Sequence, residues 1–352
     1  MTDLLTRAIK LGSLESKNPF MGAPINIRPF SESDGSVTEK DLAFYDEYGK
    51  TGLGVLVTGA TNVSPECASY TPSLGVWEDN QIEGLSLIAE RMKAQGRLAI
   101  LQIAHRGFQH LGIDAFCDVN PEECIRIQTD FINAAVRAKK ADFDGIELHA
   151  CHGYFLNQVV SPITNNCDWK YGGSLSTRVA YITEIIDMIR SQCGTDFVIG
   201  IRMGCNDPDL ETSQAIAKLY EVAGADYLSV SAGIGEPFST GKFDDNFDLG
   251  IDIPPDFRFC KRIFGAWKIK EKVSIPVACV GDLYSHDDVL DILNSGYANF
   301  IAVGRARLAD PMWYDHIVKN EQTYHCLQCK KCSWFSEPEK CPGRKLLGFA
   351  PI

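Results

Sequence analysis

The sequence has no apolar run long enough to span a membrane and no excess of positive charge. A transmembrane helix needs about 20 consecutive, mostly apolar residues, and no such stretch occurs among the 352 residues. The chain has 34 lysines and arginines against 46 aspartates and glutamates, which gives a net charge of -12 at pH 7. Negative charge of this size disfavours nucleic acid and anionic membrane surfaces, so we expect neither as a partner.

The sequence also has no apparent secretion signal and no glycine-rich nucleotide turn. The first 18 residues, MTDLLTRAIKLGSLESKN, lack a long apolar core. Most of the 13 cysteines stand singly, as Cys151, Cys205 and Cys279 do, which suits free thiols in a reducing cytoplasm. Gly52 and Gly54 precede an apolar run instead of following one, which argues against an open dinucleotide-binding sheet. We therefore expect a cytoplasmic protein with a different α/β architecture.

Short apolar runs alternate with helical patterns from about residue 19 to about residue 320. The runs predict strands at 19–24, 53–58, 98–103, 144–149, 197–203, 226–231, 276–280 and 300–303. The helical patterns lie at 38–50, 80–95, 121–140, 176–192, 212–223, 258–272, 286–295 and 305–308, with a further turn at 311–319. Eight alternations predict an α/β fold of the (β/α)8, or TIM, barrel type. We expect the barrel to occupy residues 1–320 and a cysteine-rich extension to occupy residues 321–352.

The stretch 145–162, GIELHACHGYFLNQVVSP, has the strongest functional signal. A short apolar run typical of a buried parallel strand leads directly into His149, His152 and Tyr154. Ligands bind at the carboxyl ends of the strands in such folds. Two imidazoles can donate hydrogen bonds to a substrate oxygen, and the phenol can donate a proton. Alternatively, the histidines are satisfied core residues and the tyrosine packs, although an ordered cluster at a strand exit favours a functional site.

Polar and small residues follow the other predicted strands, and a barrel would bring them to the same mouth. They are Asn26, Ala60, Gln102, His105, Arg202, Gly281, Asp282, Gly304 and Arg305. After the seventh and eighth strands, the backbone N–H groups of Gly281 and Gly304 could approach a phosphate closely and Arg305 could pair with it. The alternative is that these glycines only end their strands.

The motif HACHGYFLNQVVSP, followed by YGGSL at 171–175 and by Arg178, resembles the old yellow enzyme family of FMN-dependent ene-reductases. The similarity extends from about Asn18 to Pro311 and is strong again in ANFIAVGRARLADP at 298–311. It implies that FMN is the cofactor and NAD(P)H the electron donor. The residues that it places on FMN are Ala23, Pro24, Ile25, Asn26, Ala60, Gln102, Arg202, Gly281, Asp282, Gly304 and Arg305. His105 is interpreted as a residue of the site wall.

The resemblance also implies the reaction. NAD(P)H reduces the flavin, and an activated alkene, an enone or enoate, then takes its place. His149 and His152 would hold the substrate carbonyl oxygen, the flavin would deliver a hydride to the β-carbon, and Tyr154 would protonate the α-carbon. The loop at 232–257, with Lys242, Asp244 and Asp245, is expected to select the alkene. The sequence leaves open the choice between NADH and NADPH and the oligomeric state, and a homo-oligomer is compatible with it.

Four grouped cysteines follow the barrel. Cys326, Cys329, Cys332 and Cys341 form the pattern C-x2-C-x2-C-x8-C. Four thiolates at such spacings could hold a 4Fe–4S cluster or a structural zinc ion, or remain metal-free. The pattern resembles the cysteine set of the dienoyl-CoA reductase branch, in which a cluster connects FMN to an FAD domain. The sequence ends at Ile352, so we expect no FAD domain here.

Two other functions are compatible with parts of the sequence. A barrel lyase or aldolase could bind a phosphorylated substrate at Gly281 and Gly304, but it would need a Schiff-base lysine or metal-binding carboxylates at strand ends, and we find neither. An electron-transfer or redox-sensing flavoprotein would use the cysteine tail as its working part. The colour of the protein separates the lyase from the flavoproteins, and alkene turnover without the four cysteines separates the ene-reductase from the redox sensor.

Overall fold

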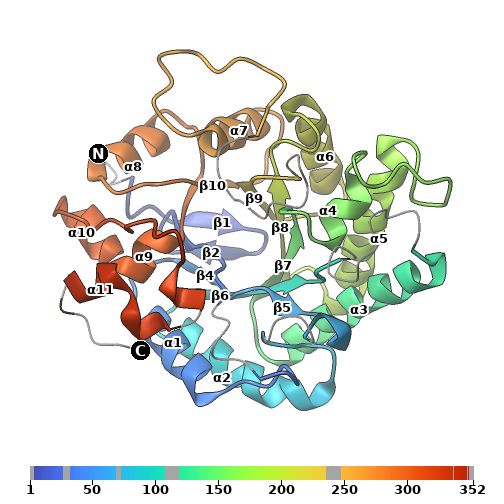
Figure 1. The fold of residues 1–352 in the computed structure, drawn as a ribbon, viewed down its shortest axis with the longest axis horizontal. Helices are drawn as coiled ribbons and strands as arrows, with labels where there is room; N and C mark the ends of the chain where they lie inside the picture. The colour runs from blue at the N-terminus through green and yellow to red at the C-terminus, as the bar shows by residue number, and fades with distance from the viewer. Residues whose placement is uncertain are drawn as a thin grey trace.

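The structure is a computed structural model that describes residues 4–26, 32–68, 73–107, 119–234, 247–335, 337–346 and 348. In these residues, eight parallel strands close into a barrel and confirm the predicted (β/α)8 fold (Figure 1). In ring order they are β3 (Phe20–Gly22), β4 (Val55–Val57), β6 (Leu98–Ala104), β7 (Gly145–Ala150), β8 (Val198–Gly204), β9 (Tyr227–Ser231), β10 (Val277–Val280) and β11 (Phe300–Val303). The ring closes because β3 pairs with both β4 and β11, and β5 (Thr61–Asn62) extends the edge of β6.

Helices surround the strands on the outside of the barrel. They are α1 (Glu39–Gly49), α2 (Ile82–Lys93), α3 (Pro121–Lys140), α5 (Leu175–Cys193), α6 (Leu210–Val222), α7 (Lys261–Lys270), α8 (His286–Asn294), α9 (Arg305–Ala309) and α10 (Trp313–Lys319). Their starts follow local chemistry that the sequence displays. Thr38 and Asp41 form a capping box at α1, and the side chain of Asn120 caps α3 ahead of Pro121.

A short hairpin plugs the amino-terminal end of the barrel, and the sequence analysis did not predict it. It consists of β1 (Ile9–Leu11) and β2 (Leu14–Ser16), paired in antiparallel fashion. Gly12 turns the chain with a φ of +57°. Leu11 is fully buried in the apolar cluster inside the barrel. The hairpin and this apolar cluster fill the amino-terminal end of the barrel, so we look for a polar site at the carboxyl-terminal end of the strands.

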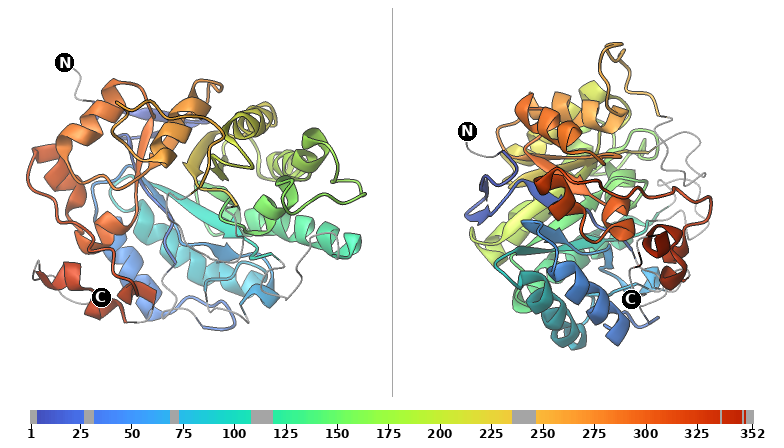
Figure 2. Two further views of the ribbon diagram at one scale, coloured as in Figure 1. Left: turned by 45° about the horizontal axis from the view of Figure 1, so that its top comes forward. Right: turned by 90° about the vertical axis from the view of Figure 1, so that its left-hand side faces the viewer.

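The segment after α10 folds back against α1 and α9. It contains η5 (Ser333–Phe335), η6 (Pro338–Lys340) and α11 (Pro342–Leu346). Arg344 forms an ion pair with Glu47 of α1 at 2.6 Å, and Trp334 is buried edge-on to Phe44. Figure 2 shows this segment beside α1. The division at residue 320 remains a prediction, although Asn320 ends α10 in a left-handed conformation at that position.

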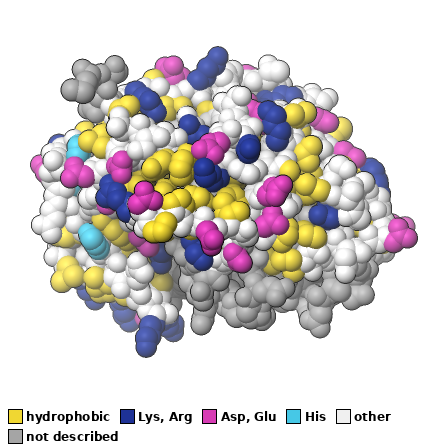
Figure 3. All heavy atoms as spheres, turned by 90° about the horizontal axis from the view of Figure 1, so that it is seen from above, with side chains coloured by type: hydrophobic (Ala, Val, Ile, Leu, Met, Phe, Trp, Pro, Cys, Tyr) yellow, Lys and Arg dark blue, Asp and Glu magenta, His cyan; other side chains and the backbone are white. Residues whose placement is uncertain are grey.

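On the face in Figure 3, hydrophobic side chains gather near the centre with charged side chains of both signs around them. Within the described ranges, no helix combines the length and apolar character needed to cross a lipid bilayer.

Candidate active site

Buried polar side chains form a ladder across the upper barrel. Gln102 on β6 donates from Nε2 to Glu147 Oε1 on β7 at 2.8 Å. The hydroxyl of Tyr227 on β9 donates to the other carboxylate oxygen of Glu147 at 2.9 Å. Arg202 on β8 donates to Ser229 Oγ at 2.9 Å. The register pairs Gln102 with Glu147 and His149 with Arg202, so these side chains lie at successive levels toward the mouth.

His149, His152 and Tyr154 meet directly above this ladder, as the sequence predicted. The ring of His149 stacks on that of Tyr154 with 4.2 Å between centroids and an interplanar angle of 16°. The ring of His152 stands edge-on to His149 at 5.2 Å. His152 Nε2 lies 2.8 Å from Ser231 Oγ, and this hydrogen bond fixes the second imidazole. The structure therefore places two imidazoles and one phenol in mutual contact at a strand end.

The turn that brings the three rings together depends on an unusual backbone. His152 has a φ of +59° and Gly153 a φ of +73°. A left-handed conformation is costly for a non-glycine residue and is concentrated at functional sites. The amide of Asn157 accepts a hydrogen bond from the Gly153 N–H at 3.0 Å, and Gln158 Nε2 donates to the Gly153 carbonyl at 2.8 Å. Both residues belong to α4 (Phe155–Val160), a short helix that supports the turn.

The electrostatic setting keeps the imidazoles neutral. Burial, followed by the charges of Arg202 and Arg106, lowers the pKa of His149 to about 3. Burial and the neighbouring His149 and Arg202 hold the pKa of His152 well below its usual range. A neutral imidazole has one N–H donor and one acceptor nitrogen. The pair can thus donate hydrogen bonds to a carbonyl oxygen at neutral pH without acting as acids.

The backbone after β3 and the loop after β4 face each other beside this cluster. Asn26 Oδ1 accepts a hydrogen bond from the Ala60 N–H at 2.5 Å, and the Ala23 N–H donates to the Val303 carbonyl of β11 at 2.9 Å. A Cβ built on Gly304 would meet nothing closer than Ala23 Cβ at 3.8 Å. These contacts hold the segment after β3 against β11 and against the loop after β4. Pro24 and Ile25 lie on the same segment.

The predicted phosphate residues come together after β10 and β11. Arg305 Nη2 lies 3.4 Å from Asp282 Oδ1, and both side chains are about half exposed. Gln328 Nε2 donates to the other oxygen of Asp282 at 3.3 Å. A carboxylate repels phosphate, so the contacts of Asp282 suit a residue that positions Arg305 better than a direct phosphate ligand. Gly281 directly precedes Asp282 in the sequence, and Gly304 directly precedes Arg305.

His105 is a buried structural partner of the loop after β5. Its Nε2 lies 3.3 Å from Glu66 Oε1, and its Nδ1 lies 3.1 Å from the Gly107 nitrogen. Burial alone would lower the pKa of His105, but its contacts with Cys67 and Glu66 outweigh burial and raise the pKa to about 9. His105 is therefore a charged, ion-paired wall residue at neutral pH.

This pairing predicts a pH-dependent contribution to stability. The folded-state pKa of His105, about 9, lies above the unfolded value of roughly 6.5, so the folded protein binds more protons between these values. The free energy of unfolding should fall as pH rises from 6.5 to 9, by at most about 1.4 kcal/mol per pH unit from this residue. When the free energy of unfolding is measured with urea at several pH values in this range, it should fall less steeply with pH for His105→Gln than for the wild type. The same pH dependence of the unfolding free energy in both proteins would contradict the raised pKa of His105.

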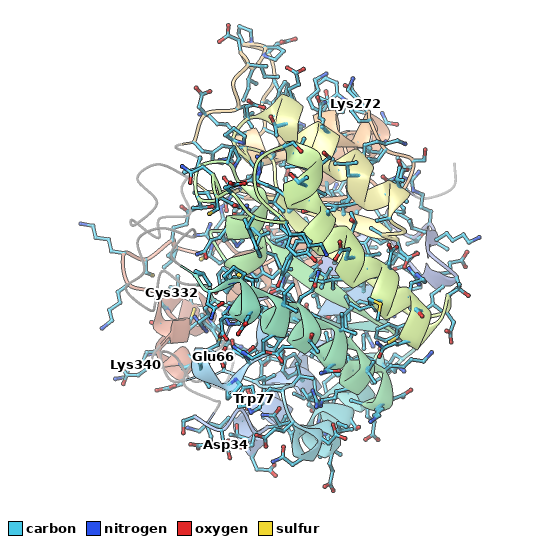
Figure 4. The ribbon with its side chains drawn as sticks, turned by 90° about the vertical axis from the view of Figure 1, so that its right-hand side faces the viewer. Asp34, Glu66, Trp77, Lys272, Cys332 and Lys340 are labelled. Atoms are coloured by element: carbon cyan, nitrogen blue, oxygen red, sulfur yellow. The ribbon has the colours of Figure 1, made fainter. Side chains whose placement is uncertain are left out.

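The four tail cysteines surround one pocket beside the Arg305 side chain. Cys326, Cys329, Cys332 and Cys341 all line it, together with Trp334 and Arg305. Figure 4 shows Cys332 and Lys340 at one edge of the barrel. Among the described residues, the one group of three metal-ligating side chains whose ligand atoms lie within 4.8 Å of one another is His149, Cys151 and His152. The tail sulfurs are thus gathered around a space but more widely separated.

Sequence reasoning missed three residues of this region. Glu147 was included in an apolar run, although a charged residue inside that run was a visible signal of a buried polar network. Ser231 ends β9, and only its contact with His152 reveals a role. Arg106 follows His105 and was passed over, and its charge acts on His149. The loop residues Lys242, Asp244 and Asp245 lie outside the described residues.

Known proteins provide an independent comparison. Residues 5–122 and 118–323 match the NADH:flavin oxidoreductase / NADH oxidase family. The chain is 32% identical over 347 residues to an NADH oxidase of Thermoanaerobacter brockii, covering 91% of this chain and 52% of that protein. It is 27% identical over 333 residues to an NADPH dehydrogenase of Bacillus subtilis, covering 89% of this chain and 94% of that protein. The chain therefore spans about half the length of the first relative and nearly all of the second.

Solved structures share the fold at lower sequence identity. A homologue of old yellow enzyme from Zymomonas mobilis superposes with a TM-score of 0.76 at 21% identity, covering 94% of this chain and 96% of that chain. A 2-naphthoyl-CoA reductase superposes with a TM-score of 0.78 at 22% identity, covering 93% of this chain and 55% of that chain. At these identities the likeness establishes the architecture alone.

Proposed function

Because this chain belongs to the NADH:flavin oxidoreductase / NADH oxidase family, the old yellow enzyme family of FMN-dependent NAD(P)H oxidoreductases, we propose that it reduces the activated C=C bond of an α,β-unsaturated carbonyl compound. The observation that carries this proposal is the contact of His149, His152 and Tyr154 at the mouth of the barrel. Two neutral donors and a phenol in this arrangement suit a carbonyl oxygen and an adjacent carbon that needs a proton.

The residues around the cluster fit FMN. Asn26 and Ala60, joined by a hydrogen bond, would lie along the ring, and the guanidinium of Arg202 is buried with Ser229 as its hydrogen-bonding partner. A buried cation stabilises negative charge on a neighbouring ring. Arg305, positioned by Asp282, would pair with the phosphate near Gly281 and Gly304. When bound, FMN supplies hydride chemistry.

The protein's own residues would bind the alkene and provide its proton. His149 and His152 would donate hydrogen bonds to the carbonyl oxygen, which becomes more negative during reduction. Tyr154 stacks on His149, and its phenol would deliver a proton to the α-carbon. The net change adds a hydride and a proton across the C=C bond.

A product assay tests this function directly. The FMN-loaded protein, supplied anaerobically with NAD(P)H and a panel of enones and enoates, should form the saturated carbonyl compound in a one-to-one ratio with the NAD(P)H consumed. NAD(P)H consumption without a saturated product from any member of the panel would refute the proposal. Trials with NADH and with NADPH would identify the donor.

We further propose a 4Fe–4S cluster at Cys326, Cys329, Cys332 and Cys341. Four thiolates around zinc would lie about 3.8 Å apart, as follows from a Zn–S distance of about 2.3 Å. Within the described part of the chain, no three of these sulfurs lie within 4.8 Å of one another. The wider spacing and the shared pocket favour a larger inorganic core over a single zinc ion.

Metal analysis checks the tail assignment. Protein purified without oxygen should contain about four iron atoms per chain and absorb visible light beyond the flavin bands. Replacing the four cysteines by serine should remove the iron while alkene turnover continues. Stoichiometric zinc, or a metal-free tail, would contradict the cluster. Loss of alkene turnover with FMN retained would favour the redox-sensing alternative, in which the tail is the working part.

A further inference from the structure

Arg106 is a buried arginine at the barrel mouth with almost no partners. It stands two residues beyond the end of β6, and 4% of its surface is exposed. Its Nη2 lies 3.5 Å from Ser73 Oγ, a long contact, and its Nε is buried without a hydrogen-bonding partner. In the described ranges, no carboxylate forms an ion pair with it. A buried guanidinium without an ion pair is destabilising, because no anion compensates for the hydration that it loses.

Other buried arginines of the described chain are paired differently. Arg178 donates to the backbone carbonyls of Val160 and Gly173. Arg344 forms its ion pair with Glu47, and Arg307 lies over the ring of Tyr48 at 3.5 Å. Each of these side chains has a structural explanation within the fold. Arg106 lacks one, which suggests that its anion arrives with a ligand.

Arg106 follows β6, the strand that pairs with β7, and β7 leads into the two histidines. The side chains of Gln102 and Glu147 meet inside the barrel, and their strands are in register. Residues two apart on a strand share a face. The face of Glu147 on β7 therefore leads to His149, and the face of Gln102 on β6 leads to Ala104, two residues before Arg106. The positive charge of Arg106 is one of the causes that lower the pKa of His149.

The mouth around the two imidazoles has a positive field. Arg202 acts on both histidines, and Arg262 of α7 acts on His152. The nearby acid Glu147 is occupied by its hydrogen bonds to Gln102 and Tyr227. Arg202 on β8 and Arg106 after β6 lie on opposite sides of β7, which carries His149. This field would attract an anionic molecule into the site.

We propose that the substrate is an α,β-unsaturated carbonyl compound that also bears a carboxylate, and that Arg106 binds this carboxylate. The inference rests on the proposed ene-reductase function and specifies its substrate class. The planar guanidinium suits a carboxylate because it can donate two parallel hydrogen bonds. The carbonyl held by His149 and His152 activates the alkene, and the carboxylate, unchanged in the reaction, fixes the position of the molecule.

A matched pair of compounds tests the proposal on the FMN-loaded protein. We would compare 4-oxo-2-pentenoate with its neutral methyl ester as substrates, using Arg106→Gln, Arg106→Lys and the exposed control Lys272→Gln. The wild type should have the higher kcat/KM for the acid. Arg106→Gln should lower that value roughly 100-fold, mainly through KM, while the ester changes less than about threefold. Arg106→Lys should retain part of the preference, and Lys272→Gln all of it.

Binding of the saturated product separates this inference from the reaction itself. The flavin spectrum should report tighter binding of 4-oxopentanoate than of its methyl ester, with the difference lost in Arg106→Gln. This result would support the carboxylate site even if no alkene were reduced, in which case the proposed function alone would fail. Equal losses for acid and ester, a wild-type preference for the ester, or loss of FMN from Arg106→Gln would each overturn the role of Arg106.

Discussion

Tyr154→Phe should slow oxidation of the reduced enzyme by an alkene by about 10²- to 10⁴-fold, the range over which a positioned general acid contributes. The ring of Tyr154 stacks on that of His149, the proposed donor to the carbonyl oxygen. Phenylalanine keeps the aromatic ring for stacking and removes only the hydroxyl group, which carries the proton. Reduction of the flavin by NAD(P)H needs no proton from this residue, so that half-reaction should change only a few-fold.

Stopped-flow measurement of the two half-reactions checks this result. Tyr171→Phe is the matched control, because the Tyr171 hydroxyl donates to Glu184 at 2.5 Å instead of entering the cluster. It should leave both half-reactions near their wild-type rates. If Tyr154→Phe slowed both half-reactions equally, Tyr154 would be a binding or structural residue and the proton would come from elsewhere.

His149→Leu should lower the rate of alkene reduction by about 10²- to 10³-fold, as expected for loss of a donor to a developing oxyanion. His149→Asn keeps an N–H donor and should recover part of the rate. Because the pKa of His149 is lowered to about 3, the imidazole is neutral throughout the range from pH 5 to pH 8. The wild-type rate should therefore show no titration of His149 in that range.

Single-turnover oxidation of the pre-reduced enzyme by an enone, measured across this pH range, separates these expectations. His286→Asn provides a matched histidine change outside the site, since His286 bonds the Ile317 carbonyl through Nδ1 at 2.7 Å. Loss of alkene reduction as pH falls from 8 to 5, present in wild type and absent from His149→Asn, would mean that His149 titrates near neutrality. The neutral-donor role would then be wrong.

The barrel could be predicted because its local signals agree with one another. Runs such as 277–280 and 300–303 are apolar over their full length, as strands covered by helices on the outside and packed on the inside must be. Thr38 and the Asn120–Pro121 pair mark helix starts by local hydrogen bonding and fixed φ, so neither needs tertiary context. The cluster of His149, His152 and Tyr154 was predictable for the same reason: it is contiguous in sequence.

Features that depend on distant contacts were not predictable. The β1–β2 hairpin has three residues per strand, and its stability comes from Leu11 packing inside the closed barrel. The isolation of Arg106 is a property of its surroundings that no local pattern displays. His105 was interpreted as a wall residue from its local sequence, but its partner Glu66 is 39 residues away. The positions of the tail sulfurs similarly follow from packing against α1 and α9.

The central claim is that FMN lies across the barrel mouth beside two imidazoles and a phenol and passes reducing equivalents to an alkene. Its most direct test is the visible spectrum of the purified protein, recorded without oxygen during successive additions. The account predicts flavin bands that bleach on addition of NAD(P)H and return on addition of an α,β-unsaturated carbonyl compound. A protein that stays colourless after incubation with FMN, or bleached bands that no such compound restores, would contradict it.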